Sequence, residues 1–353
     1  MQSTLLPKSA VAVAAALLVA ALGLAAAKPS PTAVVAVSAQ PGAVVGTAQN
    51  SDAFIWTLFT QFAAPLYKTR PSPVVFETWA SDADTFSKTP HWPGPDEPKK
   101  FQVSVLNRMT ATHPGPIDVP CSPPGNAGVG GFPTSGTPAP CIAEETKRNR
   151  PLYDYIVGNG LNTQAGLAAA FAKKLDVQMP TAAIAVKGDW VPVQTLLQWI
   201  PQLGSIANIE RLYCTATSAS VEYALVSLHV SSRQNPNWVW GTFEHQMNPG
   251  RCDDLGCFDS FGAAIPAVMP NRKAVNTQYG ACPKTKRLET LMTQANLSPV
   301  WGNYCLKATM VDYTAADGTP YALGNSVIER IVGNGTVAAT SVRVAKPCPN
   351  PAT

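Results

Sequence analysis

The chain has 353 residues, of which 46% are hydrophobic and 14% are charged, and it contains 33 prolines and 25 glycines. This hydrophobic fraction supports a large core and excludes a wholly disordered protein, while a formal net charge of only +4 without a long basic run argues against a nucleic-acid groove. A charged fraction well below the roughly 25% of average proteins, combined with many prolines, favours an exported protein with long loops.

Residues 1–27 have the pattern of a secretory signal peptide. Lys8 provides a positive charge, an uncharged apolar stretch follows at 10–24, and three alanines at 25–27 suit a cleavage site. The apolar stretch is short for a span of ~20 residues, so we expect cleavage and no stable membrane span afterwards. The mature protein is therefore expected to be periplasmic or secreted, with residues 28–50 as a flexible lead-in.

The eight cysteines all follow the expected leader, and an even number in an oxidising compartment implies up to four disulfides. Short intervening loops favour two pairs, Cys252 with Cys257 and Cys121 with Cys141. The second pair would close a proline- and glycine-rich excursion at 112–141, which has little regular structure of its own.

Three helices are predicted in the N-terminal half, with short strands and turns between the first and the second. A helix begins at the capping residues 50–52, carries apolar residues at helical spacing and ends at Pro65. Short strands and turns are expected over 67–110. Two further helices are predicted at 142–156, before a Gly-Asn-Gly stop, and in the alanine-rich segment 163–174.

From residue 181 onwards the pattern changes to that of strands. The strands expected from apolar and aromatic runs are 182–186, 223–230, 238–243, 303–313 and 321–328. One clear helix, at 284–297, interrupts them. The predicted fold class is α+β, an antiparallel sheet with packed helices and long disulfide-stapled loops, forming a single large domain over 51–353.

The best local cluster of chemically capable side chains lies at the end of the aromatic strand. Glu244 and His245 are suited to binding a metal or transferring a proton, and His229 on the preceding strand is a natural second nitrogen ligand. A tight hairpin centred near residues 234–235 would place His229 opposite about Trp240, roughly 13–16 Å from Glu244 and His245 at ~3.3 Å per residue. These side chains would meet only if the connection were long or bulged. The competing interpretation is that these are buried polar residues satisfied by hydrogen bonds in a tryptophan-rich core.

Two other features have competing interpretations. The loop from Cys252 to Cys257 holds two aspartates, but it lacks the alternating oxygen ligands of a calcium loop and is better read as a disulfide-closed turn. Trp238 and Trp240 share one face of their strand, so they could line a surface that binds sugars or aromatic compounds, although core packing is the commoner role.

Several segments carry a resemblance to known proteins. They are Leu-His-Val-Ser-Ser at 228–232, Trp-Val-Trp-Gly-Thr-Phe-Glu-His-Gln-Met-Asn at 238–248, Asn-Tyr at 303–304, Leu-Gly-Asn-Ser-Val-Ile-Glu at 323–329, and Phe-Ile-Trp-Thr-Leu-Phe at 54–59 with Phe-Glu-Thr-Trp at 76–79. In these patches, spread over residues 50–330, the chain resembles a poorly characterised family of exported bacterial cytochrome c-like proteins. Many members of that family carry a haem-attachment Cys-x-x-Cys-His shortly after the Leu-Gly-Asn-Ser motif.

This chain departs from the family at that point. After Glu329 it contains only Cys348 and no histidine, and Cys-x-x-Cys-His occurs nowhere in the sequence. Covalent c-type haem is excluded because its attachment requires both cysteines and the axial histidine. The resemblance then implies a shared scaffold without the electron-transfer role, unless a partner protein supplies the haem.

The sequence therefore predicts an exported, cell-envelope binding or accessory protein that recognises another envelope protein or a small molecule. The cofactor is unknown. The alternative is a metal-dependent enzyme, hydrolytic or redox, with a site around Glu244 and His245 that includes His229 or Asn248.

Overall fold

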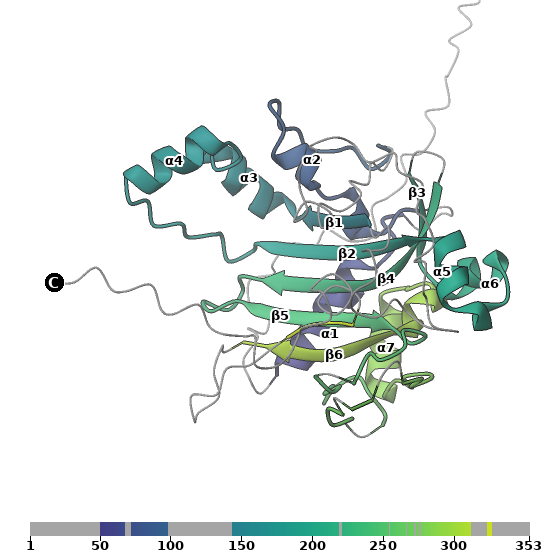
Figure 1. The fold of residues 1–353 in the computed structure, drawn as a ribbon. Helices are drawn as coiled ribbons and strands as arrows, with labels where there is room; N and C mark the ends of the chain where they lie inside the picture. Colours follow the sequence, from purple (N-terminus) through teal and green to yellow (C-terminus); the bar gives the residue numbers. More distant parts are fainter. Residues whose placement is uncertain are drawn as a thin grey trace, which may run out of the picture.

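The computed structural model in Figure 1 describes nine stretches of the chain: 50–67, 72–97, 143–218, 221–253, 255–265, 267–271, 273–274, 277–311 and 323–326. The expected signal peptide, the lead-in up to residue 49, the excursion at 112–141 and the pair Cys121–Cys141 lie outside the described residues. In the described part, no helix has the length and hydropathy needed to cross a membrane.

A six-stranded antiparallel sheet forms the centre of the fold, which confirms the predicted α+β class. The strands are β1 (Ala143–Arg148), β2 (Ile184–Pro192), β3 (Thr215–Ser218), β4 (Val221–Ser232), β5 (Val239–His245) and β6 (Tyr304–Met310). Their order is β1-β2-β4-β5-β6, with β3 also paired to β4.

Helices cover one face of the sheet and both of its ends (Figure 1). The α-helices are α1 (Ser51–Phe62), α2 (Asp82–Thr85), α3 (Arg150–Gly158), α4 (Gln164–Ala172), α5 (Val193–Trp199), α6 (Ile206–Leu212) and α7 (Lys286–Gln294). The described residues also form the 3-10 helices η1 (Val75–Thr78), η3 (Pro201–Leu203) and η4 (Pro299–Asn303).

The main core lies between α1 and the sheet. Phe243 of β5 contacts the rings of Trp56 and Phe59, with centroid distances of 4.9 and 4.6 Å. A Cβ atom at Gly241 would lie only 2.5 Å from Cγ2 of Ile55, so the absence of a side chain there allows α1 to approach the strand this closely. The helix predicted from residue 50 is thus confirmed, and its apolar stripe is what covers the sheet.

A register shift divides the opposite face of the sheet into two parts. Asp189 pairs with Ser227 but Trp190 pairs with Leu225, which leaves Val226 as the extra residue of a bulge. On one side of the bulge, Val226 joins a second core under α5 and α6. On the other side the face is polar; we call it the polar face, and its members are Lys187, Asp189, Ser227, His229, Thr242 and Glu244.

The helix predicted at 142–156 is wrong in its first half, where the chain forms β1. Segment 143–148 pairs along its whole length with β2, and this pairing outweighs its local composition. The helix begins only at Arg150, because the Asn149 side chain caps it by accepting from the amide of Leu152, and Pro151 lies in its first turn.

Other elements agree with the sequence to varying degrees. The helices expected at 163–174 and 284–297 are confirmed as α4 and α7, whereas 67–97 contains η1 and α2 where strands and turns were expected. The predicted pairing of 303–313 with 321–328 falls mainly outside the described residues. The short helices α5 and α6 were not anticipated.

Two disulfides occur among the described residues. Cys252–Cys257 was predicted and is confirmed, so its loop is a disulfide-closed turn. The carboxylate of Asp253 within it accepts a hydrogen bond from the Tyr279 hydroxyl at 2.6 Å. The second disulfide, Cys282–Cys305, was not predicted and ties the segment before α7 to β6.

Candidate functional site

The Glu244 carboxylate lies on the polar face, wholly buried, and is enclosed by hydrogen bonds. The backbone amide of Ser326 donates to Oε1 at 2.7 Å, the Ser326 hydroxyl donates to Oε2, and the Asn248 amide donates to Oε2 at 3.2 Å. The ammonium of Lys307, which is also buried, lies 3.1 Å from Oε1. Glu244 therefore holds together β5, β6, the turn after β5 and the segment 323–326.

Two cations balance this buried carboxylate. Besides Lys307, the nearby guanidinium of Arg251 is buried, and burial lowers its pKa while the charge of Glu244 opposes that change. Arg251 also donates to the carbonyl of Gln246 at 2.8 Å. A carboxylate with a close ion-pair partner and several donors has little remaining capacity to bind an added metal ion.

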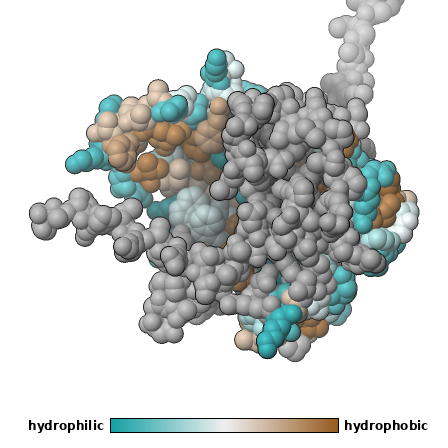
Figure 2. Space-filling model, in the orientation of Figure 1, coloured by the Kyte–Doolittle hydropathy of each residue, from teal (hydrophilic) through white to brown (hydrophobic). Residues whose placement is uncertain are grey.

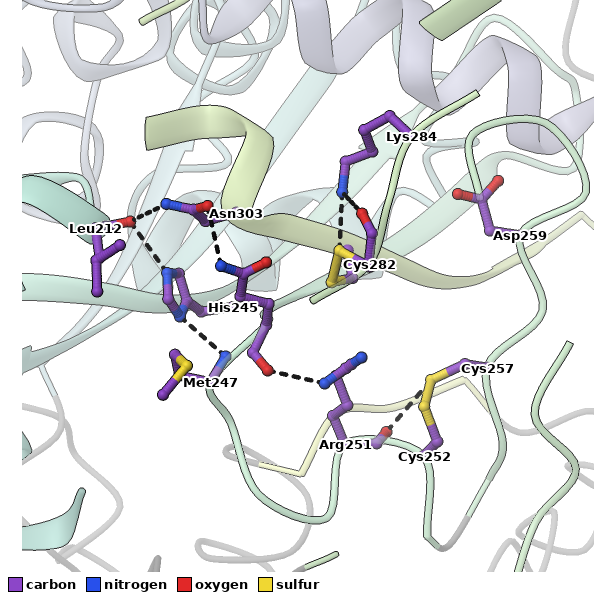
Figure 3. The surroundings of a disulfide bond; sticks show 12 residues. Leu212, His245, Met247, Arg251, Cys252, Cys257, Asp259, Cys282, Lys284 and Asn303 are labelled. Atoms are coloured by element: carbon purple, nitrogen blue, oxygen red, sulfur yellow. Dashed lines mark hydrogen bonds between the residues drawn. A yellow bond between two sulfur atoms is a disulfide. The ribbon is translucent and has the colours of Figure 1, made fainter. Parts of the chain in front are cut away.

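His245 occupies the opposite face, because successive strand residues alternate. Its ring stacks on Tyr213 with a centroid distance of 3.5 Å. Nε2 lies 3.1 Å from the carbonyl oxygen of Leu212, and Nδ1 lies 3.2 Å from the backbone nitrogen of Met247 (Figure 3). One nitrogen must donate and the other accept, which is the pattern of a neutral imidazole.

Burial maintains that neutral form. It lowers the pKa of His245 to about 3; the hydrogen bond to Leu212 acts in the opposite direction, and the charges of Arg251 and Lys284 lower it further. A metal could bind His245 only by displacing one of its two backbone partners. The geometry is that of a structural histidine.

His229 lies closer to Glu244 than the sequence suggested. The chain between β4 and β5 spans six residues, 233–238, so His229 pairs with Thr242 and not with Trp240. That register places His229 and Glu244 on the same face, two residues apart along the sheet. His229 Nε2 lies 3.2 Å from the side-chain nitrogen of Asn325.

Beside Glu244, the polar face presents hydrogen-bonding atoms without partners among the described residues. The Thr242 hydroxyl and the Trp240 indole nitrogen are both buried and unpartnered, as is the Oδ1 atom of Asn248. Half-buried Lys187 and His229, paired across β2 and β4, border Thr242 on the same face. Buried polar atoms are normally satisfied, so this group marks the polar face as a place where a ligand would be stabilised.

A buried amine lies near the Cys282–Cys305 disulfide (Figure 3). The Lys284 ammonium donates to the carbonyl of Cys282 at 2.9 Å and lies 2.8 Å from its sulfur. Burial lowers the pKa of Lys284 to about 7, although the Asp259 carboxylate opposes this. The amine is therefore partly neutral near pH 7. Its contacts are with Cys282 in the same loop, which gives Lys284 a structural role.

Sequence reasoning also missed an exposed cluster of possible metal ligands. Ligand atoms of Asp84, His91 and Glu97 all lie within 4.8 Å of one another. His91 Nε2 is 3.2 Å from the Glu97 carboxylate and 3.6 Å from that of Asp84. Both carboxylates face the same nitrogen of His91, and Asp84 is already engaged in capping α2 through Ser81.

The partners of the site come from far along the chain. Ser326 is 82 residues from Glu244, and Asn325 is 96 residues from His229. One signal did point to them, because the Leu-Gly-Asn-Ser motif at 323–326 was singled out by resemblance. In the structure, that motif and the Trp-Val-Trp motif of β5 are in contact through Glu244.

No family model, curated protein or solved structure matches this chain. Its function therefore has to be inferred from the geometry of the site.

Removing the charge of Glu244 should destabilise the fold strongly. Glu244→Gln leaves Lys307 buried without its close ion-pair partner, and we expect the free energy of unfolding to fall by about 3–5 kcal/mol. The double variant Glu244→Gln/Lys307→Met should recover part of this loss. Denaturant unfolding measures both effects, with Asp154→Asn in the exposed Arg150–Asp154 pair as a control that changes stability by about 0.5 kcal/mol or less. A Glu244→Gln variant as stable as the control would contradict the role assigned to this carboxylate.

Acid should destabilise the protein partly through His245. The unfolded chain binds a proton at this histidine below about pH 6.5, whereas the folded chain does so only near pH 3. The contribution of the neutral His245 to the free energy of unfolding is therefore lost as the pH falls from about 6.5 to about 3. Between pH 7.5 and 4.5 the wild type should lose about 2–3 kcal/mol more than His245→Gln. Parallel stability–pH curves for the two proteins would show that His245 is not held neutral.

Proposed function

We propose that this is an exported binding or accessory protein of the cell envelope, which holds a small, oxygen-rich ligand on the polar face. The observation that carries the proposal is a pair of buried polar atoms, the Thr242 hydroxyl and the Trp240 indole nitrogen, which have no hydrogen-bond partner in the part of the chain that the structure describes. They lie two residues apart on β5 and so belong to the same face. A buried donor or acceptor without a partner costs about 1–3 kcal/mol, which a ligand would recover.

The chemistry of these side chains narrows the class of ligand. The Trp240 indole nitrogen can only donate, and the Thr242 hydroxyl can donate or accept. Lys187 adds a positive charge and His229 a further polar group. A carboxylate or a sugar hydroxyl supplies oxygen acceptors for the indole and is compatible with the other groups.

The metal-enzyme alternative has less support. It requires a metal to be held by Glu244 and His245, whose side chains lie on opposite faces of the sheet and are each engaged by protein partners. The two disulfides support an oxidising compartment, and with it export.

Thr242→Val tests this proposal because it removes the hydroxyl and keeps the shape of the side chain. We expect the unfolding free energy to be unchanged or to rise by up to about 1 kcal/mol, since an unsatisfied buried group is lost. Thr85→Val is the matched control. Thr85 is equally buried, but its hydroxyl donates to the carbonyl of Ser81 at 2.7 Å, so its loss should lower stability by about 1 kcal/mol.

Binding is measured on the same variants by thermal shift with citrate, acetate, glucose and N-acetylglucosamine. At least one probe should stabilise the wild type and Thr85→Val but not Thr242→Val. A probe that stabilises all three equally binds elsewhere, and a Thr242→Val variant as destabilised as Thr85→Val would mean that the hydroxyl already has a partner. Either result would count against the polar face as the ligand site.

A further inference from the structure

Helix α4 stands apart from the core of the molecule. It projects from one end of the sheet together with α3, and Figure 2 shows apolar surface over this projection. None of its residues is buried. The side chain of Phe171 is 87% exposed and that of Leu167 is 53% exposed, while Leu175 and Val177 just beyond the helix are each 45% exposed.

The projection is nevertheless a defined structure. At the start of α4, the Thr163 hydroxyl caps the helix by accepting from the amide of Gly166 at 3.0 Å. A side chain at Gly166 would collide with the carbonyl of Gly160, so α4 and the end of α3 are closely packed. At its end, the amides of Lys174 and Leu175 bond back to Phe171 and Ala170, as in a Schellman motif.

The apolar character of α4 extends around its whole circumference. Its sequence, Gln-Ala-Gly-Leu-Ala-Ala-Ala-Phe-Ala, contains one polar side chain, at the first position. A helix that is apolar all round is typical of a buried or membrane-inserted segment and not of one exposed to water. Exposed apolar surface of this kind marks an interaction site.

Charges at the end of the helix fit a membrane surface. Lys173 and Lys174 follow α4 directly, and both are exposed. Asp176, which accepts from the Gln178 amide at 3.0 Å, is the acidic group of this segment, so the net charge beside the apolar tip is positive. A nine-residue helix is about 13.5 Å long, enough to enter the ~5–10 Å interfacial layer of a bilayer.

We propose that α4 is a membrane-contact element, which inserts Leu167 and Phe171 into the interface of a bilayer containing anionic lipids while Lys173 and Lys174 contact the headgroups. This contact is separate from the polar face and does not depend on the proposed ligand.

The test is flotation of the exported, leader-free protein with vesicles of phosphatidylcholine, with or without one quarter phosphatidylglycerol. The wild type should float with the mixed vesicles. Leu167→Gln/Phe171→Gln keeps a helix-forming sequence and should bind at least about tenfold more weakly. Lys173→Gln/Lys174→Gln should lose about tenfold of the affinity that phosphatidylglycerol adds.

Met269→Gln is the matched control, because Met269 is 70% exposed and lies outside the projection. It should bind vesicles like the wild type, and thermal melting should show all variants to be folded. A wild type that does not float, or a Leu167→Gln/Phe171→Gln variant that floats equally well, overturns the proposal. A dimer that dissociates in this variant, with no vesicle binding by the wild type, would assign α4 to a second copy of the chain instead.

Discussion

The buried carboxylate of Glu244 is the constraint on which the rest of the structure depends. A charge in the interior is tolerated only with a counter-charge and hydrogen bonds, and here Lys307, Ser326 and Asn248 provide them. These partners belong to β6, to segment 323–326 and to the turn after β5. Satisfying one side chain therefore fixes two distant parts of the chain, β6 and segment 323–326, against β5, and it brings segment 323–326 onto the polar face.

The sheet separates two environments around this constraint. On one face, Gly241 and Phe243 receive α1 in a dense aromatic core, and His245 is held neutral between backbone groups. On the other face lie Thr242 and Glu244, which alternate with Gly241, Phe243 and His245 along β5. The polar face ends at the bulge of Val226, and beyond it α5 and α6 cover the sheet. Neighbouring residues of one motif thus have different roles: Glu244 joins segments, His245 packs in the core, and the Thr242 hydroxyl is buried without a hydrogen-bond partner among the described residues.

The sequence predicts the elements whose signal is local. The α1 helix, the apolar strand β4 and the Cys252–Cys257 turn follow from periodicity, β-branched and aromatic residues and short spacing. The strand β1 could not be predicted in this way, because its charged sequence becomes a strand only by pairing with β2. The position of His229 depends on the connection between β4 and β5, and a six-residue connection, with Trp238 at a positive φ of 65°, brings it closer to Glu244 than a tight turn would. Local sequence signals do not fix the length of such a connection. Glu244 and His245 were identified as candidates, but their partners Lys307, Ser326 and Leu212 are brought together only by the tertiary fold.

The central claim is that Glu244 and His245 are internal structural groups, and the metal content of the disulfide-bonded protein tests it most directly. Elemental analysis and a visible absorption spectrum would be recorded for the wild type, His245→Gln and His91→Gln, the last to account for the exposed Asp84–His91–Glu97 cluster. The account predicts a folded, colourless wild type without stoichiometric metal, or with metal that disappears only in His91→Gln. About one metal ion per chain that persists in His91→Gln and is lost in a folded His245→Gln variant would contradict it.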